Sequence, residues 1–157
     1  MGKASLPQRR RRAREIALQL IYELDLRPDL TSGEALSMFP FEDEQGDVES
    51  YARFLVISSA KHADAIDDLL REHIVGWRTE RMVAVDRAAI RIALCEGVMD
   101  CTVPVAVAIS EAVELTKMFG TVESSRFVNG VLGRIVRASD VKECCVEEMT
   151  SEETEKI

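Results

Sequence analysis

Aromatic residues are scarce in this chain, and their scarcity narrows the fold class. Phe, Trp and Tyr make up 5% of the 157 residues, whereas 46% are hydrophobic and 31% are charged. This composition favours a globular helical protein over a β-rich or a disordered one. A chain of this length fits one domain with a sizeable core.

Long apolar runs are missing as well. No stretch approaches the roughly 18 apolar residues that a membrane span needs. The N-terminus is charged, but no apolar segment follows it, so it does not have the pattern of a secretory signal. We therefore expect a cytoplasmic protein without a membrane partner.

The sequence also lacks the usual patterns of metal sites. The four cysteines form no CxxC pair, and the two histidines, His62 and His73, lie far from them in sequence. A zinc site needs ligands in tighter clusters, so we expect no metal. The cysteines are Cys95, Cys101, Cys144 and Cys145.

Catalytic patterns are absent too. We find no glycine-rich phosphate loop and no nucleophile placed beside a base and its orienting acid. The sequence therefore predicts a binding protein without a cofactor and not an enzyme.

What the chain does have is a cluster of arginines near its start. Residues 1–14 hold six basic residues and no acid, while the whole chain is −8, so the remainder carries −14. An acidic body repels a polyanion, and a basic arm gives it one place to bind. Arginine suits that task because its planar fork pairs bidentately with phosphate and stacks on bases. The arm comprises Arg9, Arg10, Arg11, Arg12 and Arg14.

The arm runs into a helical pattern without an intervening glycine or proline, so we expect several of its charges on an ordered scaffold. The alternative is an ordinary solvated basic tail. Tyr22 falls on the same side of that helix as Arg11, at about 100° per residue. It is either a half-buried residue at the edge of the core or a stacking platform beside the arginines.

Apolar residues recur at helical spacing and predict consecutive helices. The first covers about residues 9–26 and ends before Pro28, because proline disfavours helical geometry in the residue before it. A short helix follows around residues 33–38. The apolar pattern of residues 47–74 lapses between positions 58 and 62, so we expect two helices there.

Capping residues bound the later helices. Thr79 is the expected N-cap of a buried segment that reaches Met99. Pro104 takes the first position of the next helix, and Gly120 closes that helix in a left-handed conformation. The last helix starts near Ser124. Two glycines inside it are expected to let another helix approach closely, and these are Gly130 and Gly133.

We accordingly expect three segments: a flexible extension over residues 1–8, a helical domain over residues 9–139 and a tail over residues 140–157. The tail holds seven acids against two lysines and has no periodic apolar face. We expect it to be disordered.

Three stretches resemble the NusB family of bacterial transcription antitermination factors. The segment Arg12-Ala13-Arg14-Glu15, with the ALQ of residues 17–19, is similar to the opening of that family, and VDRAAIRIALCE (85–96) is similar to a central stretch. The strongest match is residues 103–135, which follow the family pattern of VP, VAINEAVELAK, FG and KFVNGVL almost position by position. The resemblance covers residues 9–137.

The resemblance implies an all-α bundle of about seven helices, arranged as two three-helix units. It implies a factor that binds single-stranded boxA RNA of ribosomal RNA operons. It also implies action together with NusE, a small-subunit ribosomal protein, in a complex that helps RNA polymerase pass terminators. Self-association into a homodimer stays open.

The resemblance also implies site residues, carried over position by position. RNA contacts fall to the arm and to an aromatic set with charged neighbours, namely Arg9, Arg10, Arg11, Arg12, Arg14, Tyr22, Lys117, Phe119, Glu123, Arg126 and Phe127. Contacts to NusE fall to Glu80 and Asp86, with Tyr22 near both partners.

Each group has a purely structural alternative. Phe119 and Phe127 could be core residues at a helix junction, and Glu80 and Asp86 could be helix-start acids that complement the helix dipole. Two other functions also stay open. One is a fragment of an RNA methyltransferase, although the chain has no Rossmann-type glycine motif; the other is an interaction module whose arm binds an acidic protein.

Overall fold

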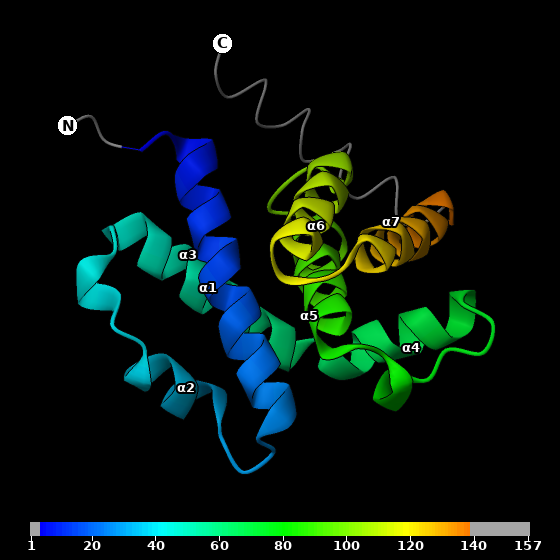
Figure 1. Ribbon diagram of the computed structural model, residues 1–157, viewed down its shortest axis with the longest axis horizontal. Coiled ribbons are helices and arrows are strands. Elements are labelled where there is room, and N and C mark those ends of the chain that lie inside the picture. Colours follow the sequence, from blue (N-terminus) through cyan, green and yellow to red (C-terminus); the bar gives the residue numbers. More distant parts are fainter. Residues whose placement is uncertain (1–3, 139–157) are drawn as a thin grey trace. The chain divides into compact units, whose positions relative to one another are not determined.

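The computed structural model describes residues 4–138 and forms, within them, seven α-helices and no strand. The chain divides into two compact units, one up to Lys61 and one from His62 onward. The first unit holds the helices α1 to α3 and the second holds α4 to α7 (Figure 1). The expected all-α fold of about seven helices is confirmed, with the helices divided three and four between the units.

Helix α1 spans Leu6–Leu26 and begins three residues earlier than expected. Ser5 and Gln8 form a capping box: the Ser5 side chain accepts from the Gln8 amide, and the Gln8 side chain accepts from the Ser5 amide. These two bonds satisfy amides that a helix start leaves unpaired. Residues 5–8, expected in a flexible extension, are therefore the cap and first turn of α1.

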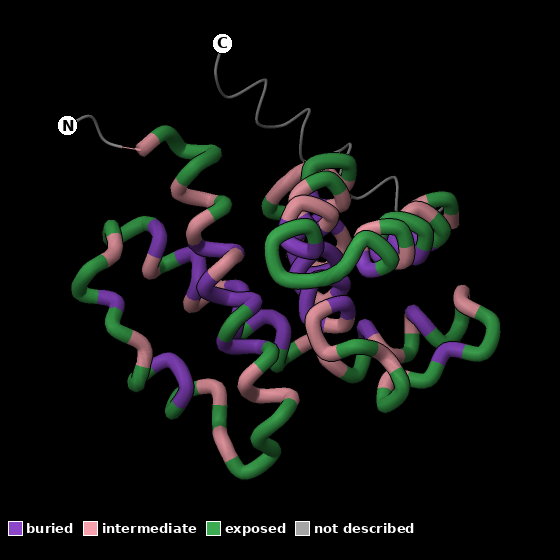
Figure 2. Tube along the Cα trace, viewed as in Figure 1, coloured by how far each residue is buried: buried purple, intermediate pink, exposed green. Residues whose placement is uncertain are grey.

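The rest of the first unit packs against α1. Helix α2 spans Ser32–Met38, a 3₁₀ turn covers Phe41–Asp43, and α3 spans Gly46–Lys61. Helix α1 lies along α3, and both contact α2. The core of this unit is aliphatic, with buried residues on α1 and α3 that include Ala13, Ile16, Ala17, Leu20, Ala52, Leu55 and Val56 (Figure 2).

The second unit begins where the predicted break falls. His62 ends the run of α3, and α4 then spans Ala63–His73. After a 3₁₀ turn, α5 spans Ala84–Leu94 and packs against α6 and α7, which cover Val105–Phe119 and Val122–Arg137. As expected, α5 is the most buried helix; Ala88, Ala89, Ile90, Ile92, Ala93 and Leu94 are each at most 2% exposed.

Two predicted helix starts are wrong: Pro104 is the N-cap of α6 and not its first residue, and Thr79 is not the N-cap of α5. Thr79 begins the 3₁₀ turn Thr79–Arg81, and α5 starts only after Val83. The Thr79 hydroxyl instead accepts a hydrogen bond from Trp77 Nε1 at 3.1 Å. The far end of the segment does reach Met99, because α5 continues into a π-helical turn over Cys95–Met99.

The glycines also behave differently from expectation. Gly120 is not left-handed: its φ is −119° and its ψ is −161°. Glycine is needed there because an added Cβ would lie 2.9 Å from the Ser124 side chain and 3.0 Å from the Thr116 carbonyl oxygen. Neither Gly130 nor Gly133 meets a neighbouring helix. The close approach occurs at Gly97, where a Cβ would lie 3.0 Å from that of Ala108 on α6.

The predicted tail and the Cys144-Cys145 pair lie outside the described residues. Across residues 4–138, none of the helices is both long and apolar enough to cross a membrane. The same residues contain no group of three or more His, Cys, Asp or Glu side chains that could hold a metal ion.

Candidate nucleic-acid interface

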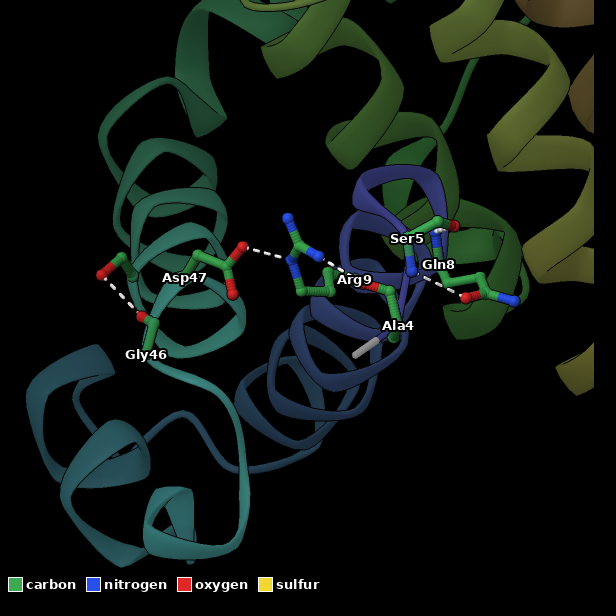
Figure 3. A network of polar contacts seen from close by, with 7 residues as sticks. Ala4, Ser5, Gln8, Arg9, Gly46 and Asp47 are labelled. Atoms are coloured by element: carbon green, nitrogen blue, oxygen red, sulfur yellow. Dashed lines mark hydrogen bonds and ion pairs between the residues drawn. The ribbon is translucent and has the colours of Figure 1, made fainter. Parts of the chain in front are cut away.

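The arginine arm is part of an ordered helix, as the sequence predicts. Arg9 lies in the second turn of α1 and reaches across to α3, where its Nε donates to Asp47 Oδ2 at 2.5 Å (Figure 3). A second donor of the same guanidinium bonds the carbonyl of Ala4. The hydrogen bond from Arg9 holds the pKa of the Asp47 carboxyl below its ordinary value. Arg9 thus pairs with a carboxylate of its own unit.

Arg12 is tied down by two acids. Its Nε and Nη2 donate to one oxygen of Glu44 at 2.9 and 2.6 Å, and its Nη1 donates to Glu15 at 3.3 Å. The Glu44 carboxylate raises the pKa of Arg12 above its ordinary value, against the opposing effect of burial. Arg12 therefore stays charged, but part of its charge is already neutralised within the unit.

Two further arginines of the arm lie against the ring of Tyr51 on α3. The guanidinium carbon of Arg10 lies 3.7 Å from the centroid of the Tyr51 ring, which is stacking distance. Arg14 lies 6.0 Å from the same centroid and is only 3% exposed. Arg11 is the arginine of the arm that lies mainly in solvent. The arm therefore presents its charges unequally: Arg11 is exposed, Arg9, Arg10 and Arg12 are partly buried, and Arg14 is largely buried.

The sequence did not identify Glu44, Asp47 or Tyr51 as partners of the arm. The only hint was that acids and an aromatic residue occur near the start of a helix. Nothing in the local pattern tells which of several acidic stretches will lie beside α1. That pairing depends on the packing of α1 against α3.

In the second unit, three predicted residues line one pocket of about 300 Å³. Asp86 enters from the start of α5, and Glu123 and Phe127 enter from α7. Asp86 is 5% exposed, and its Oδ1 has no hydrogen-bond partner among the described residues. A buried carboxylate oxygen without a donor is costly, so the pocket suits a cationic or hydrogen-bond-donating group. Glu80 is exposed in the 3₁₀ turn and does not line this pocket.

The aromatic residues differ in burial. Phe127 is partly buried and stacks on the buried Trp77, with ring centroids 6.4 Å apart and planes 6° apart. One face of Phe127 is therefore occupied within the unit. Phe119, at the end of α6, is 38% exposed, and Tyr22, on α1, is 40% exposed. The interpretation of these phenylalanines as core residues therefore holds in part for Phe127 and does not hold for Phe119.

Lys117 and Arg126 lie elsewhere, in a groove of about 500 Å³ between α6 and α7. Lys117 donates to Glu114 at 3.0 Å, while Arg126 forms no ion pair with any described carboxylate. Asn129 and Ser110 line the same groove. The residues predicted in the second unit are thus divided between this groove, the Asp86 pocket and two exposed positions, Glu80 and Phe119.

Comparison with known proteins gives consistent results along almost the whole described chain. The NusB family model matches residues 11–137. The transcription antitermination protein NusB of Symbiobacterium thermophilum is 44% identical over 137 residues, which are 82% of this chain and 89% of that protein. The NusB protein of Bacillus subtilis is 36% identical over 135 residues, covering 86% of this chain and 98% of that protein.

Solved structures agree with the sequences. The structure of T. maritima NusB superimposes with a TM-score of 0.75 at 28% identity, covering 88% of this chain and 94% of that one. A chain from a crystal structure of the antitermination factors NusB and NusE in complex with double-stranded RNA gives 0.74 at 28% identity. That match covers 83% of this chain and 97% of the other. With the helices, the arginine arm and these matches in agreement, the chain belongs to the NusB family of transcription antitermination proteins.

Proposed function

We propose that this protein binds single-stranded boxA RNA of ribosomal RNA operons together with NusE, and so helps RNA polymerase read through terminators. The observation that carries the proposal is the arginine arm, held on α1 of an acidic chain that belongs to the NusB family. Arginines on an ordered helix can meet successive phosphates, and binding releases the counterions that those phosphates hold.

The exposed aromatic residues support a single strand as the ligand. Tyr22 and Phe119 each leave roughly two fifths of their surface in solvent. Bases can stack on such side chains only when they are unpaired, because in a duplex they stack on one another. The related NusB–NusE crystal structure contains double-stranded RNA, so a duplex is the natural comparison in any binding experiment.

The acids of the second unit suit a basic protein. Asp86 offers a buried, unpartnered carboxylate oxygen in a pocket that Phe127 also lines. RNA phosphate would be repelled there, whereas a lysine or arginine of a ribosomal protein would supply the missing donor. We therefore assign Asp86, with the exposed Glu80 nearby in sequence, to the NusE contact. Tyr22 would lie close to both partners.

Two proteins are needed because the chain alone has a small cationic area. At least four of the five arginines of the arm contact carboxylates of the same unit or the Tyr51 ring. The isolated protein should therefore bind boxA only modestly, and NusE should extend the surface that meets the RNA.

The test is a titration of boxA RNA, a scrambled strand and the boxA duplex into the protein with and without NusE. We expect boxA to bind more tightly than the other two, and NusE to tighten it further. Asp86→Lys should weaken NusE binding while leaving the small intrinsic RNA affinity intact or slightly raised. Equal affinity for all three RNAs with no effect of NusE would contradict the proposal. It would favour the second candidate, a module whose arm binds an acidic protein.

A further inference from the structure

A pocket in the first unit lies beside the arm. Several of the residues that line it are not among the proposed RNA contacts. It has a volume of about 300 Å³ and is formed between the start of α1 and the start of α3. Leu6, Arg9 and Arg10 line it from α1. The residues from α3 are Asp47, Ser50, Tyr51 and Phe54.

The aromatic side of this pocket is pre-arranged. Tyr51 and Phe54 stack with ring centroids 5.8 Å apart and planes 26° apart, and Arg10 covers the Tyr51 ring at 3.7 Å. Tyr51 thus contacts both other planar groups before any ligand arrives. Leu6, 54% exposed, adds an apolar edge. A flat, apolar group is the natural occupant of such a surface.

The cationic side has unused hydrogen-bonding capacity. No described residue accepts a hydrogen bond from Arg10, although stacking on Tyr51 fixes its plane. A guanidinium has five N–H donors, so Arg10 can still bind an anion bidentately. Arg9 is held by Asp47, an exposed pair that solvent screens and that an arriving phosphate can replace. The pocket therefore offers two cations beside an apolar surface.

We infer that this pocket holds one nucleotide of the bound single-stranded RNA. Its phosphate lies on Arg9 and Arg10, and its base packs against Leu6 and Phe54. The inference rests on the proposed RNA-binding function and adds α3 to the RNA interface. An acidic peptide would use the two arginines but would gain nothing from Phe54, so the apolar surface favours a nucleotide.

Asp47 has a defined part in this site. Its carboxylate occupies Arg9 in the free protein (Figure 3), so the RNA phosphate must displace it. This displacement lowers the affinity of Arg9 for the phosphate. Replacing the carboxylate with an amide should therefore strengthen RNA binding, although Asp47 lies in the pocket itself.

The experiment uses the full chain with NusE and boxA RNA that carries 4-thiouridine at one position at a time. After irradiation, mass spectrometry identifies the crosslinked peptide. We expect one nucleotide position to crosslink to the peptide that contains Tyr51 and Phe54. Crosslinks confined to the second unit, or to residues of α1 beyond Arg10, would overturn the inference.

Affinities of matched variants supply the second readout. Phe54→Leu should weaken boxA binding about fivefold, which is near the lower end of the affinity loss expected when one base–aromatic stacking contact is removed. Phe39→Leu is the control, because Phe39 is a partly buried aromatic of the same unit that packs at a tilt against Phe41 and does not line the pocket. Asp47→Asn should tighten binding severalfold. Melting temperatures are measured for each variant, so that affinities are compared among folded proteins.

The outcomes separate the two proposals. If the wild-type protein binds no RNA even with NusE, the proposed function fails and the nucleotide site fails with it. If RNA binds but Phe54→Leu has the same affinity as Phe39→Leu, only the nucleotide site is wrong. If polyglutamate competes with RNA and Phe54→Leu weakens both ligands equally, the pocket is a general anion site, and the inference is overturned.

Discussion

Phe127 of α7 stacks almost parallel on Trp77, with ring planes 6° apart, and Trp77 in turn donates its indole N–H to Thr79. The buried tryptophan thus joins α7 to the loop that precedes α5. Phe127 belongs to this structural cluster and also lines the Asp86 pocket. A residue with both roles cannot be assigned by a binding measurement alone.

Alanine substitutions should separate structural aromatics from exposed ones. Phe127→Ala should lower the free energy of unfolding by about 2–3 kcal/mol, somewhat less than a fully buried phenylalanine, because its ring is partly exposed. Tyr22→Ala and Phe119→Ala should change stability much less, yet each should cost about 1–3 kcal/mol of RNA affinity if a base stacks there. Chemical denaturation and RNA titration of the same samples measure both quantities. A large loss of stability in Phe119→Ala with unchanged affinity would assign that residue to the core.

The arm should act electrostatically. Replacing Arg10, Arg11 and Arg12 with alanine should weaken binding to every RNA and lower the slope of log affinity against log salt. Each lost phosphate contact on a single strand should reduce that slope by about 0.7. Titrations at several salt concentrations test this. Because Arg12 also binds Glu44, the melting temperature of the triple variant is the necessary control. An unchanged salt slope would leave the arm without a role in binding.

Acid should weaken the Arg9–Asp47 pair in a defined pH range. The hydrogen bond from Arg9 lowers the pKa of Asp47 from its ordinary value of 3.8, so the folded state binds this proton less readily than the unfolded chain does. The pair therefore contributes stability above about pH 4, and the contribution is lost as the pH falls through the lowered pKa. Melting temperatures of wild type and Asp47→Asn should differ at neutral pH and converge below that range. Parallel pH profiles would show that the pair adds nothing to folding.

The glycines provide a matched set of stability predictions. Gly97→Ala should destabilise the protein by about 1–3 kcal/mol, because the new Cβ would lie 3.0 Å from Ala108 Cβ and 3.2 Å from Val105 Cα. Gly130→Ala is the control within α7: nothing lies within 4 Å of its added Cβ. Alanine there should stabilise the helix by up to about 1 kcal/mol. Denaturant titrations decide, and equal effects of the two changes would contradict the packing described at Gly97.

Helix positions could be predicted because their signals are local. The break near His62, the buried character of residues 84–94 and the early stop before Pro28 all follow from neighbours within one or two turns. The start of α1 was missed, although Ser5 and Gln8 mark it with a capping box. That signal is as local as the others and could have been used. The prediction for Thr79 was wrong because its hydroxyl accepts a hydrogen bond from the Trp77 indole and not from a helix amide.

The candidate site could be predicted only in part. The sequence identified the arm as cationic, and the family resemblance named Asp86, Glu123 and Phe127, which the fold brings into one pocket. It did not reveal that Asp47 and Glu44 bind arginines of the arm. Nor did it indicate Phe54 beside them.

By itself, the sequence determined the helices, the acidic chain with its basic start and the family to which it belongs. Only the tertiary structure decided which charges remain available and which glycines must be glycine. The physical reason is the distance along the sequence over which each kind of interaction acts. Helical periodicity acts within about four residues, whereas Arg9 and Asp47 lie 38 residues apart and Arg12 and Glu44 lie 32 apart. Such partners meet only when α1 packs against α3, and that packing follows from burial of a shared aliphatic core.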